Sequence, residues 1–238
     1  MHGPARRLFQ LRPRLRLHCR GLSAQPAALR SYLGNLQAQQ IVLADERESE
    51  LTRLADYVYG RVSAGKQVRL NFICTHNSRR SHCGAIAAEA AATFFGVPSV
   101  RGCSGGTEAT AFFPAAVAAV EGAGALVSKN GYADAAETNP VYCVDVGSEE
   151  PLRCFSKKYD DPSNPRKGYA AVMVCNHADA SCPVVPGADE RFCIQYDDPK
   201  AFDDAGEEAQ QKGYQERLAQ ISMEMLFVFS NVKQRLTI

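Results

Sequence analysis

The sequence lacks an uninterrupted run of about 18 apolar residues, the length at which a transmembrane helix is predicted. It also lacks acidic residues in its first 44 positions, where seven arginines occur. The same region has no unbroken apolar stretch of about 7–15 residues, so it does not resemble a secretory signal peptide. We therefore expect neither a membrane span nor a secretory signal.

The amino-terminal composition is typical of an organelle transit peptide. Residues 1–30 are rich in Arg, free of acids and interleaved with Leu, and they run into Ser23-Ala24-Gln25-Pro26. We expect residues 1–30 to be a disordered transit peptide that is cleaved near residues 22–31 and directs the chain to the mitochondrial matrix. A plastid address is the second choice. A basic arm for nucleic acid or an over-long start would instead leave a cytoplasmic protein.

The remainder of the chain is mildly acidic and ordinary in composition. From residue 31 onward it carries 20 Lys and Arg residues against 26 Asp and Glu residues, and we expect no nucleic-acid partner and no membrane partner. Nine cysteines are present, but an odd number without a secretory signal argues against a disulfide framework. In a reducing compartment most of them should be buried as small apolar side chains, and a few should be reactive.

Strand-like and helix-like segments alternate along the chain. This alternation predicts an α/β domain with a parallel sheet, in which ligands bind beyond the carboxyl ends of the strands. Residues 31–66 are expected to be helical, and residues 67–238 to form the α/β domain. Strands are predicted at 68–74, 99–105, 170–175 and 191–196, and a hairpin at 141–146 and 152–155. Helices are predicted at 80–95 and 114–121 and around Leu218, Ile221, Met225, Leu226 and Phe229.

The segment Cys74-Thr75-His76-Asn77-Ser78-Arg79-Arg80-Ser81 lies between a predicted strand and a predicted helix. Such a loop can surround a tetrahedral oxyanion with backbone N–H groups beside the positive end of the helix dipole. Arg80 would offer a planar fork to two oxygens of phosphate or arsenate. In that field Cys74 is expected to be a thiolate and therefore a nucleophile at neutral pH. A cysteine that simply ends a buried strand would not need Arg, Arg and Ser at these offsets.

A second pair of cysteines follows another predicted strand. Cys175 and Cys182 are seven residues apart in a polar loop, so a local rearrangement could bring the two sulfurs to bonding distance. A thiol pair near a nucleophilic cysteine can pass a disulfide outward to a reductant. Two buried cysteines around a turn are the plain alternative. A metal site is not expected, because only His177 lies nearby as a further zinc ligand.

The pair Asp197-Asp198 precedes Pro199, which makes this loop rigid. A carboxyl group held there suits the general acid that protonates a leaving oxygen. A surface turn is the alternative interpretation. The second copy of this motif, at residues 160–162, is surrounded by turn-forming residues, and we assign it a structural role.

The order of these three motifs resembles that of the thioredoxin-coupled arsenate reductases, which are relatives of the low-molecular-weight protein tyrosine phosphatases. The resemblance covers about residues 68–230 and includes the turn Ser104-Gly105-Gly106 and a helix beginning at Pro114. It implies a three-layer α/β/α fold with a four-stranded parallel sheet. Residues 67–238 would be the catalytic domain, with the predicted hairpin in an insertion at about 131–168, and residues 31–66 would be a helical amino-terminal extension.

The resemblance also implies roles for individual residues. Cys74 would be the nucleophile, Arg80 would clamp the oxyanion, Ser81 would steady the thiolate, Asn77 would shape the loop and Asp198 would be the general acid. Thr75, His76, Ser78 and Arg79 would complete the oxyanion-binding loop. His76 and Arg79 depart from the family, which usually has Gly and often Cys at these positions. Arg79 either points into the loop and adds positive charge there or faces solvent.

Three functions are compatible with this sequence. In the first, which we favour, the enzyme reduces arsenate to arsenite through a Cys74–Cys175–Cys182 relay, with no bound cofactor and with thioredoxin or glutaredoxin as external reductant. In the second, it is a low-molecular-weight protein tyrosine phosphatase that hydrolyses phosphate monoesters through a Cys74 phosphocysteine. Cys175 and Cys182 would then protect Cys74 from oxidation or have no role. The third is a redox-responsive protein that binds phosphorylated partners.

Overall fold

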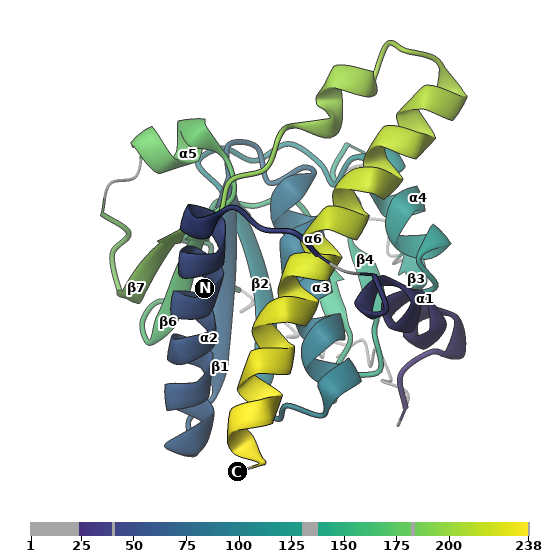
Figure 1. Cartoon of the computed structure of the whole chain (residues 1–238). Helices are drawn as coiled ribbons and strands as arrows, with labels where there is room; N and C mark the ends of the chain where they lie inside the picture. The colour runs from purple at the N-terminus through teal and green to yellow at the C-terminus, as the bar shows by residue number, and fades with distance from the viewer. Residues whose placement is uncertain (1–23, 40, 130–137, 182–183, 238) are drawn as a thin grey trace, which may run out of the picture.

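The computed structural model describes residues 24–39, 41–129, 138–181 and 184–237 (Figure 1). Its main sheet has four parallel strands in the order β2-β1-β6-β7. The α/β class and the four-stranded parallel sheet are therefore confirmed, and the flanking helices are compatible with three layers. The strands are β1 (Val68–Cys74), β2 (Val100–Gly106), β6 (Tyr169–Met173) and β7 (Ala188–Cys193).

The helices cover the sheet and frame its carboxyl edge. Helix α3 follows β1 after the cysteine-containing loop and ends where Gly96 adopts a left-handed conformation, with φ of 65°. Pro114 occupies the first turn of α4, as predicted. The helices are α1 (Ala27–Gln37), α2 (Asp45–Ser63), α3 (Arg80–Phe95), α4 (Pro114–Gly122), α5 (Asn176–Ser181), the short 3-10 helix η1 (Pro199–Phe202) and α6 (Glu207–Leu236).

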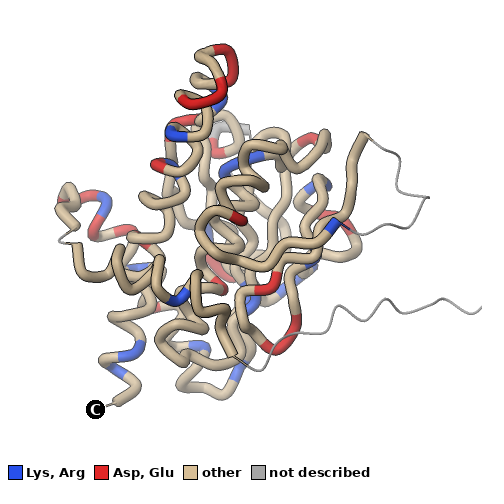
Figure 2. The backbone as a smooth tube through the Cα atoms, turned by 90° about the vertical axis from the view of Figure 1, so that its right-hand side faces the viewer, with Lys and Arg blue, Asp and Glu red and all other residues tan. Residues whose placement is uncertain are grey.

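The long helix α6 crosses the face of the molecule, and its amino-terminal end projects beyond the body together with η1 (Figure 1). Acidic residues gather at the projecting tip, as Figure 2 shows in red. Glu207 and Glu208 lie in the first turn of α6, where their negative charges interact favourably with the positive end of the helix dipole. The projection begins directly after Asp198, so it stands beside the carboxyl edge of the sheet.

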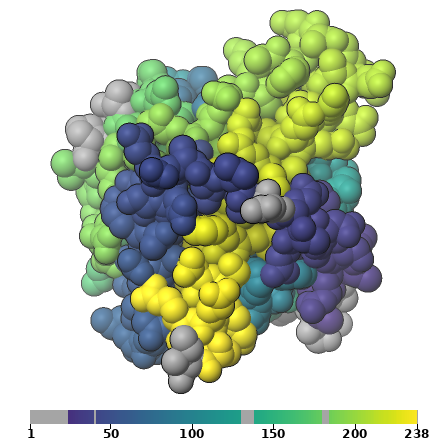
Figure 3. Space-filling model, viewed as in Figure 1, coloured from purple at the N-terminus to yellow at the C-terminus, as the bar shows by residue number. Residues whose placement is uncertain are grey.

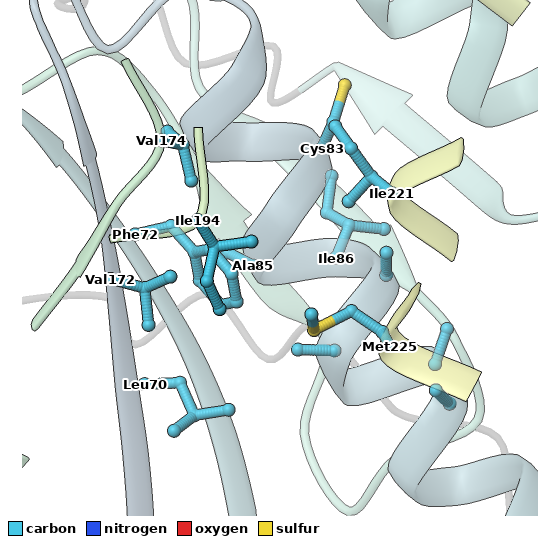
Figure 4. Packing of buried hydrophobic residues seen from close by; sticks show 14 of the residues in the cluster. Leu70, Phe72, Cys83, Ala85, Ile86, Val172, Val174, Ile194, Ile221 and Met225 are labelled. Carbon is cyan, nitrogen blue, oxygen red and sulfur yellow. The ribbon is translucent and has the colours of Figure 1, made fainter. Parts of the chain in front are cut away.

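The apolar core lies between the main sheet and the helices packed on it. Helix α3 contacts β1, β2 and α6, and α2 contacts α6, β1 and β7. A Cβ atom at Gly84 would lie 2.4 Å from the Phe72 ring, so only glycine allows α3 to approach the strand this closely. Figure 4 shows how the buried cluster continues from Leu70, Phe72 and Val172 on the strands through Cys83 and Ile86 on α3 to Ile221 and Met225 on α6.

A second, antiparallel sheet contains the predicted hairpin. Strands β4 (Tyr142–Asp145) and β5 (Leu152–Cys154) pair as expected, and β3 (Leu126–Lys129) adds a third strand on the other side of β4. Strand β3 was not predicted, and it precedes the expected insertion at 131–168. Its residues are half-buried or exposed, so no alternating apolar pattern marks it in the sequence.

The expectation that all of residues 1–30 are disordered is wrong for residues 27–30, which are helical. Helix α1 begins at Ala27, and Leu29 and Leu33 are buried in the main core. Gln25 donates from Nε2 to the carbonyl of Ala90 at 2.9 Å. Packing against distant residues overrides the composition of this segment, and cleavage as late as residue 31 would remove buried Leu29. Residues 1–23 lie outside the described part.

No helix within the described ranges is both long enough and apolar enough to cross a membrane.

Candidate functional site

The loop between β1 and α3 turns its carbonyl groups outward. Four of them accept hydrogen bonds from the surrounding segments 107–113 and 156, and no peptide bond in the described residues is cis. Because C=O and N–H point in opposite directions across a trans peptide, the amides of Thr75, His76, Asn77 and Arg79 face the inside of the loop. The bonds run from Thr107 N to Cys74 O (3.1 Å), from Glu108 N to Thr75 O (2.8 Å), from Thr110 Oγ1 and Ser156 Oγ to His76 O (3.2 and 2.8 Å) and from Phe113 N to Ser78 O (2.9 Å).

A chain of hydrogen bonds crosses the base of the loop. The Oδ1 atom of Asn77 accepts from the backbone N–H of Lys157 at 2.9 Å, which orients the amide group. Its Nδ2 therefore faces Ser81 and donates to Oγ at 2.9 Å. The Ser81 hydroxyl hydrogen remains available for Cys74, whose Sγ lies 3.1 Å from Oγ. The chain brings together Cys74, Asn77 and Ser81, three residues to which the resemblance assigns roles.

Asn77 is one of two non-glycine residues with positive φ among those described, at 45°. This left-handed conformation suits Asn better than most residues. The bonds of its side chain to Lys157 N and Ser81 Oγ hold the residue in that conformation. Its side chain is fully buried. Asn77 therefore fixes the curvature of the loop.

The end of β2 closes one side of the loop. A Cβ atom at Gly106 would lie 2.6 Å from Thr75 O and 2.7 Å from Asn77 N. Only glycine permits this approach. Gly106 also donates to Lys157 O at 2.9 Å, which draws the segment after β5 against the same wall. The Ser-Gly-Gly segment, predicted to be a turn, is the end of strand β2, and it supports the loop.

Arg80 and Asp198 meet at the opening of the loop. The guanidinium donates from Nη1 to Tyr196 O at 2.9 Å and from Nη2 to Asp198 Oδ2 at 2.5 Å. Its Nε is buried and has no partner among the described residues. Asp198 also accepts from Lys200 N at 3.1 Å and caps η1, whereas the side chain of Asp197 is 96% exposed and pairs with Arg217. Of the two neighbouring carboxyl groups, Asp198 is the one at the site.

Arg79 neither points into the loop nor faces solvent freely. Its Nε donates to Tyr214 Oη and its Nη2 to Asp203 Oδ2, both at 2.6 Å. The guanidinium also lies 4.1 Å from the centroid of the Phe113 ring. Only the backbone of Arg79 therefore belongs to the interior of the loop. The side chain of Arg79 joins the loop to the projecting end of α6 through these contacts. Both of its hydrogen-bond partners lie more than 120 residues away in the sequence.

His76 lies on the rim of the loop. Its side chain is half exposed, and Nε2 is 3.6 Å from Glu108 Oε2. Only its backbone carbonyl is held by neighbours. His76 is tolerated at this position because its side chain points away from the interior of the loop.

Cys175 lies beside the loop. Strand β6 pairs with β1 in parallel, so the residues after both strands emerge at the same edge. The buried Cys175 Sγ is 3.5 Å from Thr75 Oγ1, the residue after Cys74, and accepts from Ala178 N at 3.4 Å. Both Cys74 and Cys175 are free thiols. Cys182 lies outside the described residues.

Three other thiols are held protonated by burial. Burial and then the nearby Cys74 raise the pKa of Cys83 to about 12, and burial raises the pKa values of Cys154 to about 12 and Cys103 to about 11. Cys193, at the end of β7, is half-buried, and burial together with Asp179 raises its pKa. A thiol with a raised pKa is a poor nucleophile at neutral pH. Within the described part of the chain, Cys74 and Cys175 are the two free thiols that lie at the loop.

Sequence reasoning missed two buried residues behind the loop. His82 Nδ1 lies 3.1 Å from Ser104 Oγ, and its ring stacks on Phe112 at 4.1 Å between centroids. Burial, and then the charge of Lys157, lower the pKa of His82 well below its usual value, so the ring is neutral. Burial also lowers the pKa of Lys157. The only sequence signal was the position of His82 directly after Ser81, which did not reveal its burial.

Within the described ranges, no cluster of three or more His, Cys, Asp or Glu side chains could hold a metal ion. No protein-family model matches the chain, and the search of curated proteins found no match either.

Proposed function

We propose that the protein is an enzyme of the low-molecular-weight phosphatase type that acts on a tetrahedral oxyanion, and that its main reaction is the reduction of arsenate. The observation that carries this proposal is the position of the Cys175 thiol next to Thr75, one residue from the nucleophile. A phosphatase needs only Cys74, Arg80 and Asp198. A second free thiol buried at the same loop could, together with Cys74, supply the two electrons of the reduction by forming a disulfide.

The loop supports binding of an oxyanion. Its inward amides offer N–H groups to several oxygens, and the unpartnered Nε of Arg80 is a buried donor that an oxyanion would satisfy. Together with one Nη group, this Nε would form a bidentate fork on two oxygens. The anion would compete with Asp198 for the guanidinium. Asp198 would then be free to carry the proton for the leaving oxygen.

The proposed reduction has three steps. Cys74 attacks arsenic, and an arsenate oxygen leaves as water after protonation by Asp198. The Cys175 thiolate then attacks Cys74 Sγ, the sulfur–arsenic bond breaks, and its electron pair stays on arsenic, which leaves as arsenite. Cys182 finally attacks Cys175, releases Cys74 as a thiol and leaves a Cys175–Cys182 disulfide. Thioredoxin or glutaredoxin would reduce this disulfide by two electrons.

The alternative is hydrolysis of phosphate monoesters by the same loop. Asp198, 2.5 Å from Arg80, would serve this reaction as well, because a general acid at this point can protonate an ester oxygen. Cys74 would form a phosphocysteine, which water would then hydrolyse. Cys175 would have no part in this cycle.

The two reactions separate in one set of measurements. We expect arsenate to drive NADPH oxidation in the presence of thioredoxin and thioredoxin reductase. The Cys175→Ser variant should lose this activity while still hydrolysing aryl phosphates. Cys193→Ser is the matched control, because this half-buried thiol lies near α5 but its raised pKa makes it unreactive. The control should reduce arsenate at the wild-type rate.

Absence of arsenate-driven oxidation with either thioredoxin or glutaredoxin, combined with rapid aryl phosphate hydrolysis that Cys175→Ser leaves unchanged, would refute the reductase and favour the phosphatase. Failure of Cys74→Ser to abolish both reactions would refute the site itself.

A further inference from the structure

We propose that Arg47, on helix α2, is a positioning residue for the general acid, because it fixes the segment 195–198 that carries Asp198 and the Arg80 acceptor. This inference rests on the proposed function of the Cys74 loop. Helix α2 precedes the segment that resembles the phosphatase family. Figure 3 shows the amino-terminal end of α2 against the segment that leads from β7 to the projection.

Arg47 holds this segment at two points. Its Nη2 donates to the carbonyl of Gln195, and its guanidinium lies 4.9 Å from the centroid of the Tyr196 ring. Its Nε donates to Glu224 Oε1 of α6 at 3.2 Å. Arg47 therefore ties the backbone of the segment to both neighbouring helices.

The Tyr196 side chain completes the network. Its hydroxyl donates to Glu224 Oε2 at 2.7 Å, so Glu224 accepts from Arg47 and Tyr196 with different oxygens. Glu224 is 2% exposed and Tyr196 is 4% exposed. Burial, followed by the neighbouring Glu224, raises the pKa of Tyr196 well above its usual value, so its hydroxyl remains a donor. Such a buried network is stable only when each member keeps its partners.

The network reaches the candidate site through the backbone of Tyr196. The carbonyl of this residue accepts from Arg80 Nη1 at 2.9 Å, and its N–H donates to Val174 O at 3.2 Å. Asp198 follows two residues later. Arg217 of α6 adds a contact to exposed Asp197 at 3.4 Å. Among the described residues, Arg47 and Glu224 make no hydrogen bond or ion pair to Cys74 or Arg80, and the loop carbonyls are held by segments 107–113 and 156. A change at Arg47 should therefore displace the segment that carries the acid more than the backbone of the oxyanion loop.

Helix α2 supplies a matched control six residues further on. Arg53 also donates from Nη2 to a main-chain carbonyl, that of Arg191 at 3.1 Å, and lies 4.8 Å from the centroid of an aromatic ring, Phe192. It pairs with Glu50 on its own helix. Arg53 thus anchors α2 to β7 with the same kinds of contact but away from Asp198.

The experiment compares two aryl esters with different leaving groups. Phenyl phosphate has a basic leaving group that needs a proton, and p-nitrophenyl phosphate has a good leaving group that needs it much less. In Arg47→Gln we expect kcat for phenyl phosphate to fall by about tenfold or more, because a misplacement of about 1 Å can cost this much. With p-nitrophenyl phosphate the loss should be several-fold smaller, and inhibition by inorganic phosphate should change less than kcat for phenyl phosphate, because other segments hold the backbone of the loop. Arg53→Gln should not change the ratio of the two rates.

Hydrogen–deuterium exchange gives a second measurement on the same variants. Amides of residues 195–198 should exchange faster in Arg47→Gln, and amides of the loop 74–81 should not. Equal losses with both esters, or a ratio that changes as much in Arg53→Gln, would overturn the inference alone. If the wild type neither hydrolyses these esters nor reduces arsenate, and inorganic phosphate does not bind to it, the proposed function fails and the inference with it.

Discussion

Replacement of Ser81 by alanine tests the hydrogen-bond chain at the base of the loop. Ser81 is fully buried, and its Oγ accepts from Asn77 Nδ2 at 2.9 Å and lies 3.1 Å from Cys74 Sγ. Removal of Oγ leaves a buried amide donor without its acceptor, which costs about 1–3 kcal/mol in the free energy of unfolding. The reactive thiolate form of Cys74 would lose a hydroxyl donor, and a hydrogen bond to a charged group contributes about 1.5–3 kcal/mol. At about 1.4 kcal/mol per tenfold, Cys74 should react roughly 10- to 100-fold more slowly.

The assay is alkylation of the peptide containing Cys74 by iodoacetamide at pH 7, followed by mass spectrometry, with urea unfolding measured in parallel. Ser222→Ala is the matched control, since this buried serine of α6 bonds to Tyr32 away from the loop. The control should lower stability without slowing alkylation of Cys74. Alkylation of Ser81→Ala at the wild-type rate would refute the role of the hydroxyl.

Three further outcomes are expected. In the folded protein His82 has a pKa well below 6.5, so only the unfolded chain takes up a proton at this residue as the pH falls through about 6.5. The free energy of unfolding should therefore fall towards pH 5 by up to about 1.4 kcal/mol per pH unit. Denaturation curves of wild type and His82→Asn, measured over this pH range, should differ by this slope. Leu33→Ala in α1 should lower the free energy of unfolding by about 2–5 kcal/mol, whereas exposed Asn35→Ala on the same helix should change it little; equal effects would contradict the packing of α1. A fusion of residues 1–31 to a fluorescent protein should enter mitochondria, and a cytosolic reporter would refute the proposed targeting.

Structural features that depend only on residues close together in the sequence were predicted correctly. The limits of β1 and α3 agree with the structure at both ends, because a compact apolar run and an alanine-rich run ending at glycine mark them clearly. The cysteine-containing loop needs only the spacing of residues 74–81 between these elements. Strand β3 was missed, since its stability comes from pairing with β4 and not from its own pattern.

The placement of individual side chains at the site depended on distant segments. Asp197 and Asp198 are adjacent residues of the same type, but only Asp198 forms an ion pair with Arg80. Arg79 was left with two orientations, and the structure gives a third, because Tyr214 and Asp203 come from elements far along the chain. Nothing in the sequence around Arg47 indicated its role, because the contact between α2 and residue 195 exists only in the folded chain.

The position of the cysteine-containing loop and the alternation of strands and helices could be predicted from residue type and spacing, because both depend on residues close together in the sequence. The meeting of Cys74, Cys175 and Asp198 at one edge follows from the parallel order β2-β1-β6-β7. The contacts of Arg47, Arg79 and His82 depend on how α2, α3 and α6 pack on that sheet. Long-range packing is set by the shape and volume of many buried side chains together, and no local pattern contains that information.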